Sequence, residues 1–230
     1  MKKLLVKTGL LCFSTLLIAC SGSNSSKQQR SASDSIAAEL QSKKTASSEN
    51  QVVNYLGSQE TIIFDGITYN LAWSHPPQAK GTYYIQEYMP DGQKIEKYND
   101  IFILDLGKGN ESIEASVKQK VDWLKERKST DPLVNYKVLQ NQDQSEYIVD
   151  LLVSDDNVIE WDVIRYTYYL ENEKPVGIKT FTMSKRAYAD NQEAFLQNLK
   201  KEKARLIEEF TKLPFPTIKL DLSDSKNEKE

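Results

Sequence analysis

The amino-acid sequence predicts an α+β domain in which an antiparallel β-sheet packs against two helices. Segments rich in β-branched and aromatic residues follow one another in two runs, as expected for strands. The links between them are mostly polar and short, and a parallel return would need a dozen or more residues, so neighbouring strands should be antiparallel. One segment with helical apolar spacing separates the runs and another closes them, so strands and helices do not alternate as in a βαβ fold.

The first run of strands begins with a hairpin. Its expected strands cover residues 61–64, 67–73, 82–89 and 101–106. The Asp-Gly pair at 65–66 is typical of a two-residue hairpin turn. The His-Pro-Pro segment at 75–77 cannot continue a central strand, so we expect a loop there. The Pro-Asp-Gly segment at 90–92 predicts the turn that ends the third strand.

A helix, a second run of strands and a closing helix follow. The apolar residues at helical spacing in the first helix are Ile113, Val117, Val121 and Leu124. Either Asn110 or Ser112 can cap its N-terminus, and Asp131-Pro132 closes it. The second run of expected strands covers residues 134–139, 147–153, 158–170 and 176–183. The closing helix covers 191–213 and ends at a Leu-Pro-Phe-Pro segment.

The run YYIQEYMPDGQKIEKYNDIFIL, followed by a helix, a meander and a long closing helix, resembles the PsbP-like group. That group is named for the extrinsic subunit of photosystem II and includes bacterial lipoproteins. The shared motif is Gln86-Glu87-Tyr88 before a Pro-Asp-Gly turn and an apolar strand, although Tyr98 stands where relatives tend to carry tryptophan. The resemblance implies a PsbP-like arrangement of the sheet and helices. It implies no reaction, because the group shares a scaffold more than an activity.

The N-terminus has the pattern of an export signal. Lysines precede an apolar segment at 10–19 that is too short to cross a bilayer as a helix. The sequence Leu-Ile-Ala-Cys at 17–20 resembles the lipobox of bacterial lipoproteins. That resemblance implies removal of signal peptide 1–19 and a diacylglyceryl group on the Cys20 thiol, usually with a further acyl chain, such as palmitate, on the new amino group. A signal anchor with an incidental cysteine is the alternative.

Acylation at Cys20 would anchor the protein without a membrane span, because two or three acyl chains on one residue bind almost permanently. Ser21 follows the cysteine, which by resemblance favours the outer membrane of a diderm bacterium over retention at the inner one. Residues 20–57 comprise the lipidated cysteine and a serine-rich segment expected to be a disordered tether. Its serine-rich part, residues 21–50, would have a root-mean-square reach of about 30 Å as a flexible chain. The α+β domain is expected at 58–218, with a polar tail at 219–230.

The charge of the mature chain excludes one class of partner. Signal removal takes three of the 30 lysines and arginines and leaves 27 against 33 acidic residues, a net charge of −6. Such an acidic chain lacks the basic surface that nucleic-acid binding requires, so no nucleic acid is expected as a partner. Cys12 leaves with the signal and Cys20 is acylated, so no disulfide is expected either.

No catalytic, cofactor-binding or metal-binding residues are predicted. His75 is the only histidine and is expected in an exposed loop. The Gly-Lys-Gly segment at 107–109 lacks phosphate-loop spacing and predicts a surface loop, while 155–157 predicts a hairpin turn rather than a calcium loop. Glu160 and Asp162 share one face of a strand, which we expect to be the solvated face rather than a glycosidase pair.

Arg165 is in phase with core-facing residues of its strand, and Glu146 is expected opposite it. A cross-strand ion pair, or a bulge that swaps faces, is favoured over an anion site. Several tyrosines could form a recognition surface, but sheet packing is the favoured interpretation: Tyr83, Tyr84, Tyr88, Tyr166, Tyr168 and Tyr169.

The sequence therefore predicts a non-enzymatic envelope lipoprotein, anchored by Cys20 to the outer membrane and facing the periplasm. Its domain would bind or scaffold a partner, as an accessory to an envelope assembly. A periplasmic carrier of a small apolar ligand is the alternative, which would need a cavity between the sheet and the long helix. A hydrolase built on carboxylates alone is the third candidate.

Overall fold

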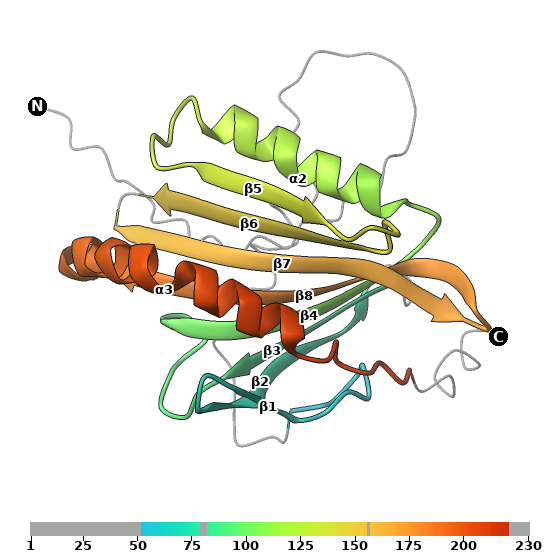
Figure 1. The fold of residues 1–230 in the computed structure, drawn as a ribbon. Coiled ribbons are helices and arrows are strands. Elements are labelled where there is room, and N and C mark those ends of the chain that lie inside the picture. The colour runs from blue at the N-terminus through green and yellow to red at the C-terminus, as the bar shows by residue number, and fades with distance from the viewer. Residues whose placement is uncertain (1–51, 79–81, 156, 221–230) are drawn as a thin grey trace, which may run out of the picture. The chain divides into compact units, whose positions relative to one another are not determined.

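The computed structural model describes residues 52–78, 82–155 and 157–220, which contain one eight-stranded antiparallel sheet and two α-helices (Figure 1). The predicted α+β class is therefore confirmed. The strands are β1 (Thr61–Phe64), β2 (Ile67–Gln78), β3 (Tyr83–Met89), β4 (Asp100–Lys108), β5 (Asn135–Gln140), β6 (Glu146–Asp155), β7 (Val158–Glu171) and β8 (Lys174–Tyr188). The helices are α2 (Ile113–Arg127), the short 3-10 helix η1 (Ala189–Asn191) and α3 (Gln192–Lys212).

The sheet consists of two four-stranded meanders joined in the middle. Its strand order is β1-β2-β3-β4-β8-β7-β6-β5, so β4 of the first meander pairs with β8 of the second. The link from β4 to β5 must cross from the centre of the sheet to its far edge. Helix α2 makes this crossing and packs against β5, β6 and β7. This path places α2 over β5, β6 and β7, on the side of the sheet that ends at the β5 edge.

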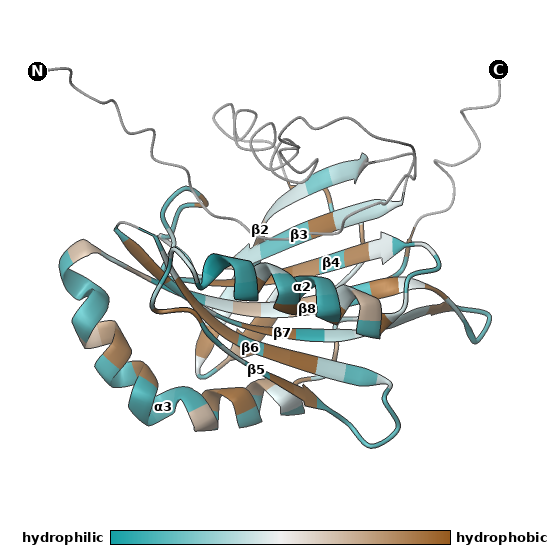
Figure 2. Ribbon diagram, turned by 90° about the horizontal axis from the view of Figure 1, so that it is seen from above, coloured by the Kyte–Doolittle hydropathy of each residue, from teal (hydrophilic) through white to brown (hydrophobic). Residues whose placement is uncertain are grey.

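Helix α3 packs on the opposite face. Alternating side chains of β4, β7 and β8 form an aromatic and aliphatic core with the apolar stripe of α3, which includes Leu199, Leu206 and Phe210. The rings of Phe102, Phe181 and Phe210 lie 5.1–5.7 Å apart between their centroids. Brown and teal segments alternate along α3 in Figure 2, as expected for a helix with one apolar stripe.

The face under α2 carries two apolar clusters. Ile113, Val117 and Leu124 of α2 pack on residues of β6 and β7, including Val149 and Ile164. The second cluster belongs to β3, β4 and the loop between them: Ile85, Met89, Tyr98, Ile101 and Ile103. Ser112 caps α2 as predicted, because its Oγ accepts a hydrogen bond of 3.2 Å from the backbone N–H of Ala115.

Strand β2 corrects the loop expected at 75–77, because it continues through His75, Pro76 and Pro77 to Gln78. Strand β1 pairs only with residues 67–70 of β2, so the prolines lie beyond the β1–β2 ladder and their missing N–H groups cost that ladder no hydrogen bond. The register with β3 also shifts between His75 and Gln78, which marks an irregular end to the strand.

The surface loop expected at 107–109 is also corrected. Gly107 and Lys108 are the last residues of β4 and pair with Ile178 and Gly177 of β8. A Cβ at Gly177 would lie 2.4 Å from the Gly107 carbonyl oxygen, so the close approach of the two strands requires glycine there.

The ends of the domain meet on the α3 face. Leu56 is fully buried, and the N–H of Lys219 donates a 2.8 Å hydrogen bond to its carbonyl oxygen. Packing on this core extends to Leu220, so the contacts reach beyond both ends of the predicted range 58–218. The signal peptide, Cys20 and most of the predicted tether and tail lie outside the described residues. No helix within the described ranges is long and apolar enough to cross a membrane.

Candidate functional site

A band of buried polar side chains crosses the sheet face under α2, between the two apolar clusters. Strand alternation turns these residues towards this face from β3, β4, β7 and β8, and α2 adds one lysine. The charged members are Glu87, Asp105, Lys120, Glu160, Asp162 and Arg186. Buried charges are rare unless they are paired or functional, so each one needs an account of its partners.

Asp105 lies at the centre of the band on β4. The hydroxyl groups of Tyr83 and Thr180 donate hydrogen bonds of 2.7 and 3.0 Å to its two carboxylate oxygens. Burial nevertheless raises the pKa of Asp105 to about 6, since the hydrogen bonds and the Lys120 charge offset desolvation only in part. Asp105 therefore titrates near neutral pH.

Lys120 reaches this region from α2 and is only 6% exposed. Its Nζ lies 5.3 Å from the centroid of the Trp123 ring. Within the described ranges it makes no hydrogen bond and no ion pair shorter than 4.0 Å. Burial lowers the pKa of Lys120, and the carboxylates of Asp162, Asp105 and Glu160 counteract this.

Asp162 on β7 is a buried carboxylate whose hydrogen bonding is incomplete. Its Oδ1 is buried and has no hydrogen-bond partner, and the same holds for Oγ of Ser116, one helical turn before Lys120. Burial, and then the neighbouring Glu160 charge, raise the pKa of Asp162 well above its usual value. Unsatisfied buried polar atoms are rare in native proteins, so these two mark an unusual position in the fold.

Glu160 is better satisfied. Its carboxylate pairs with Arg186 of β8 and accepts a longer bond of 3.4 Å from the Ser184 hydroxyl. The Arg186 guanidinium also lies 4.2 Å from the centroid of the Tyr98 ring. The prediction that Glu160 and Asp162 occupy a solvated face is wrong, because each is 6% exposed. The α2 crossing places them on an interior face.

The band combines an acidic excess with partly unsatisfied donors and acceptors. Lys120 can donate, Asp162 can accept or donate according to its protonation, and Ser116 can do both. In the part of the chain that the structure describes, no group of three or more His, Cys, Asp or Glu side chains is placed to hold a metal ion. The side chains of the band present hydrogen-bond donors and acceptors on the sheet face under α2.

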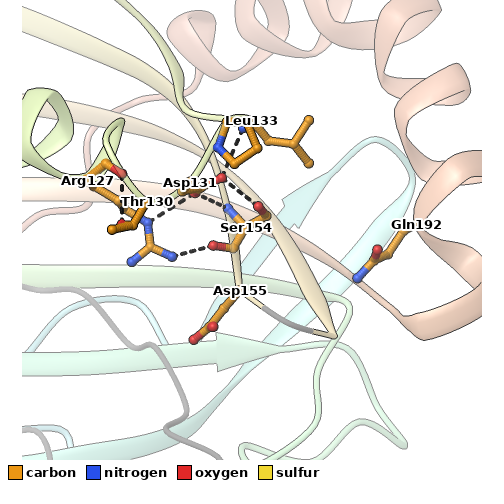
Figure 3. A pocket seen from close by; sticks show the side chains of 8 residues that line it. Arg127, Thr130, Asp131, Leu133, Ser154, Asp155 and Gln192 are labelled. Carbon is orange, nitrogen blue, oxygen red and sulfur yellow. Dashed lines mark hydrogen bonds and ion pairs between the residues drawn. The ribbon is translucent and has the colours of Figure 1, made fainter.

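A second polar site lies where α2 ends, beside the β6–β7 hairpin. A cavity of about 400 Å³ is lined by Arg127, Thr130, Asp131, Pro132, Leu133, Ser154, Asp155 and Gln192 (Figure 3). Asp131 accepts hydrogen bonds from the backbone N–H groups of Leu133 and Ser154, from the Ser154 hydroxyl and from Arg127. Burial opposes ionisation of Asp131, but these bonds, led by those of Ser154, hold its pKa below the usual value. Asp131 thus connects the C-terminal end of α2 to β6 through hydrogen bonds.

Arg165 occupies a structural position on the α3 face. Its Nε pairs with Glu146 Oε1 at 2.6 Å, so the predicted ion pair is confirmed. The residue directly opposite Arg165 is Ile148, and Glu146 is its diagonal neighbour. Nη1 donates to the carbonyl oxygens of Phe210 and Leu213 at 3.1 and 2.7 Å. Arg165 therefore satisfies the C-terminal end of α3.

The remaining sequence candidates also have structural roles. His75 lies in β2 with its Nδ1 2.7 Å from the Pro76 carbonyl oxygen. Lys108 forms an ion pair of 2.8 Å with Glu171. The hairpin turn predicted at 155–157 is confirmed, because Asp155 pairs with Val158. Tyr88 and Tyr166 are buried in the core, which confirms sheet packing for these two tyrosines.

The sequence analysis did not identify Lys120 or Asp105, although the apolar periodicity around each of them predicts burial. Lys120 is three residues after Val117 and four before Leu124, so it lies in the apolar stripe of α2. Asp105 alternates with Ile101 and Ile103 and so points to the same sheet face. In both cases a charged residue stands at a position whose periodicity predicts burial.

Comparison with known proteins gives one match. A protein-family model matches residues 56–215, which covers the sheet and both helices. No curated protein and no solved structure matches the chain.

Proposed function

We propose that this chain, which belongs to the family whose model matches residues 56–215, is a lipid-anchored envelope protein whose domain binds a ligand or partner without catalysing a reaction. The anchor is a diacylglyceryl group on Cys20. Ser21 assigns the protein to the outer membrane of a diderm bacterium, with the domain in the periplasm. The domain serves as an accessory part of an envelope assembly.

The anchor proposal is supported by the order of features at the N-terminus: lysines, ten uncharged residues, an Ala-Cys pair and then serines. The PsbP-like arrangement is also a proposal. An antiparallel sheet with one helix on each face is compatible with it, and the Gln-Glu-Tyr motif lies on β3.

The observation that carries the binding proposal is the incomplete hydrogen bonding of the α2-side polar band. Asp162 Oδ1 and Ser116 Oγ are buried without partners, and Lys120 makes no ion pair within the described ranges. A fold that only needed stability would gain from apolar residues at these positions. The apolar-carrier alternative has less support, because aromatic rings fill the space between the sheet and α3.

One observation favours a second candidate, a carboxylate-based hydrolase. Glu160 pairs with Arg186, whereas Asp162 has a raised pKa and an unpartnered oxygen. Two neighbouring carboxyl groups in such different surroundings are typical of an acid and a base with separate roles. A bell-shaped pH dependence of hydrolysis of an envelope polymer, lost in Asp162→Asn, would establish this candidate.

In vivo cross-linking of intact cells tests the proposal most directly, with mass spectrometry of what co-purifies. We expect a stoichiometric envelope partner, and palmitate labelling that is lost in Cys20→Ser. Lys118→Met, an exposed change on α2, is the matched control and should leave both signals unchanged. Absence of labelling in the unmodified chain would overturn the anchor, and absence of any captured partner would overturn the accessory role.

A further inference from the structure

We propose that Ser116, Lys120 and Asp162 form a binding site for a neutral ligand that carries hydroxyl groups, such as a sugar or polyol. In this site a ligand hydroxyl accepts a hydrogen bond from Lys120 Nζ and donates one to Asp162 Oδ1. The inference rests on the proposed function, because it names the ligand class of the same band.

The first step of the argument is that two buried polar atoms, Ser116 Oγ and Asp162 Oδ1, have no hydrogen-bond partner, and that Lys120 forms no direct ion pair within the described ranges. Lys120 and Asp162 are each more than nine-tenths buried, and Ser116 stands one helical turn from Lys120. Lys120 Nζ is farther than 4.0 Å from every carboxylate oxygen of the described residues, although Asp162, Asp105 and Glu160 all act on its charge. A direct hydrogen bond is shorter than this limit, so Lys120 acts on these carboxylates through its charge alone, and in the proposed site a ligand hydroxyl lies between Lys120 and Asp162.

The second step concerns charge. An anionic ligand would face the carboxylates of Asp105, Glu160 and Asp162, with Glu87 nearby on β3. A cationic ligand would satisfy Asp162 but leave Lys120 without an acceptor. A hydroxyl group can accept from Lys120 and donate to Asp162 at the same time, and it adds no charge to the band. It is the functional group that satisfies both residues together.

The third step concerns the surroundings. Trp123, on the same helix as Lys120, is half-buried, and its ring centroid lies 5.3 Å from Lys120 Nζ. Aromatic faces give apolar contact area to the C–H groups of a ligand, while the charged groups fix its hydroxyls. A bound water could make the same two hydrogen bonds but would gain nothing from the ring. The experiment must therefore separate a hydroxylated ligand from water.

The test uses the full mature lipidated protein in a detergent without sugar groups. Calorimetric titrations would use N-acetylglucosamine, glucose and glycerol as probes, with permethylated glucose as the probe that lacks hydroxyl donors. We expect saturable binding of at least one hydroxylated probe and none of the permethylated one. Asp162→Asn and Lys120→Met should each weaken binding about tenfold or more, since each removes a hydrogen bond to a charged or acidic group. Lys118→Met and Asp122→Asn, on the exposed face of α2, should change it less than about twofold.

Thermal unfolding of every variant separates loss of the site from loss of the fold. Equal binding of glucose and its permethylated form, or binding unchanged in both site variants, would overturn the proposal. So would the absence of binding of all hydroxylated probes, since water alone would then occupy the site. If cross-linking still captures an envelope partner in that case, only the ligand assignment fails and the proposed function stands.

Discussion

The two faces of the sheet each bury one cation, and the two differ in how completely that cation is satisfied. Arg165 on the α3 face is 5% exposed, pairs with Glu146 and donates to two carbonyl oxygens at the end of α3. Lys120 on the α2 face is 6% exposed and has no comparable partner in the described ranges. The two side chains are thus buried to a similar degree, but Arg165 has several direct partners and Lys120 has no comparable one among the described residues.

This difference indicates a structural role for the Arg165 charge and a candidate binding role for the Lys120 charge. Arg165 has a fixed geometry and connects two elements, as expected of a residue that stabilises the fold. Lys120 is buried without a direct ion pair within the described ranges, and buried titratable groups with shifted pKa values cluster at functional sites. This distinction can be tested by substituting Arg165 and Lys120 separately and measuring stability and binding.

Arg165→Met should have the largest effect on stability. It removes the Arg165 donor from Glu146 and from the Leu213 carbonyl oxygen, and leaves the Phe210 carbonyl oxygen with only the Leu213 N–H. Breaking a buried ion pair in this way costs about 3–5 kcal/mol. Urea denaturation should show the unfolding midpoint at a much lower concentration. Lys200→Met, an exposed change on α3, should leave the midpoint almost unchanged. An unaltered midpoint together with lost partner binding would instead make Arg165 a binding residue.

The next largest effect concerns pH and Asp105. The groups that face it are Tyr83 and Glu87 of β3, Thr180 of β8 and Lys120 of α2. Its pKa rises from 3.8 to about 6 on folding, so the folded state holds the proton more tightly. The stability from Asp105 is therefore present below pH 3.8 and is lost as the pH rises through 6. The loss is about 3 kcal/mol, from 1.4 kcal/mol per pKa unit.

Asp105→Asn cannot titrate and should not show this loss. Measured from pH 4 to pH 7.5, the free energy of unfolding of the variant minus that of the unmodified chain should rise by about 2.4 kcal/mol, because part of the loss falls below pH 4. Asp131 offers a contrast of opposite sign, since its pKa is lowered and its stabilisation is lost as the pH falls through that value. A constant difference for Asp105→Asn across this range would show that Asp105 is ionised throughout.

The sequence could predict most of the strands but not the joining of the two meanders. Turn residues and short links are local, so the hairpins at 65–66 and 155–157 could be identified. The pairing of β4 with β8 is long-range and depends on how α2 crosses the sheet. The loop prediction at the β2 prolines is wrong because their effect depends on where β1 ends, and β1 pairs only with residues 67–70 of β2.

The candidate site was missed for a related reason. Glu160 and Asp162 were recognised as lying on one strand face, but only the path of α2 decides that this face is buried. Lys120 was passed over because lysine on a helix is usually solvated. Arg165 and Glu146 were found because a β-hairpin brings them together locally, even though their register differs by one diagonal step.

Lys120→Met should have the smallest effect on stability and the opposite sign to Arg165→Met. Burial lowers the pKa of Lys120, so the ammonium group is less stable in these surroundings than in water. Methionine has a similar length and no charge, and replacing a poorly compensated buried ion by an apolar residue is often stabilising. We expect unfolding by urea at pH 7.5 to show a gain of about 1 kcal/mol, together with loss of ligand binding. A loss of several kcal/mol would mean that the ammonium group is paired in solution, and Lys120 would then belong with Arg165 among the structural cations.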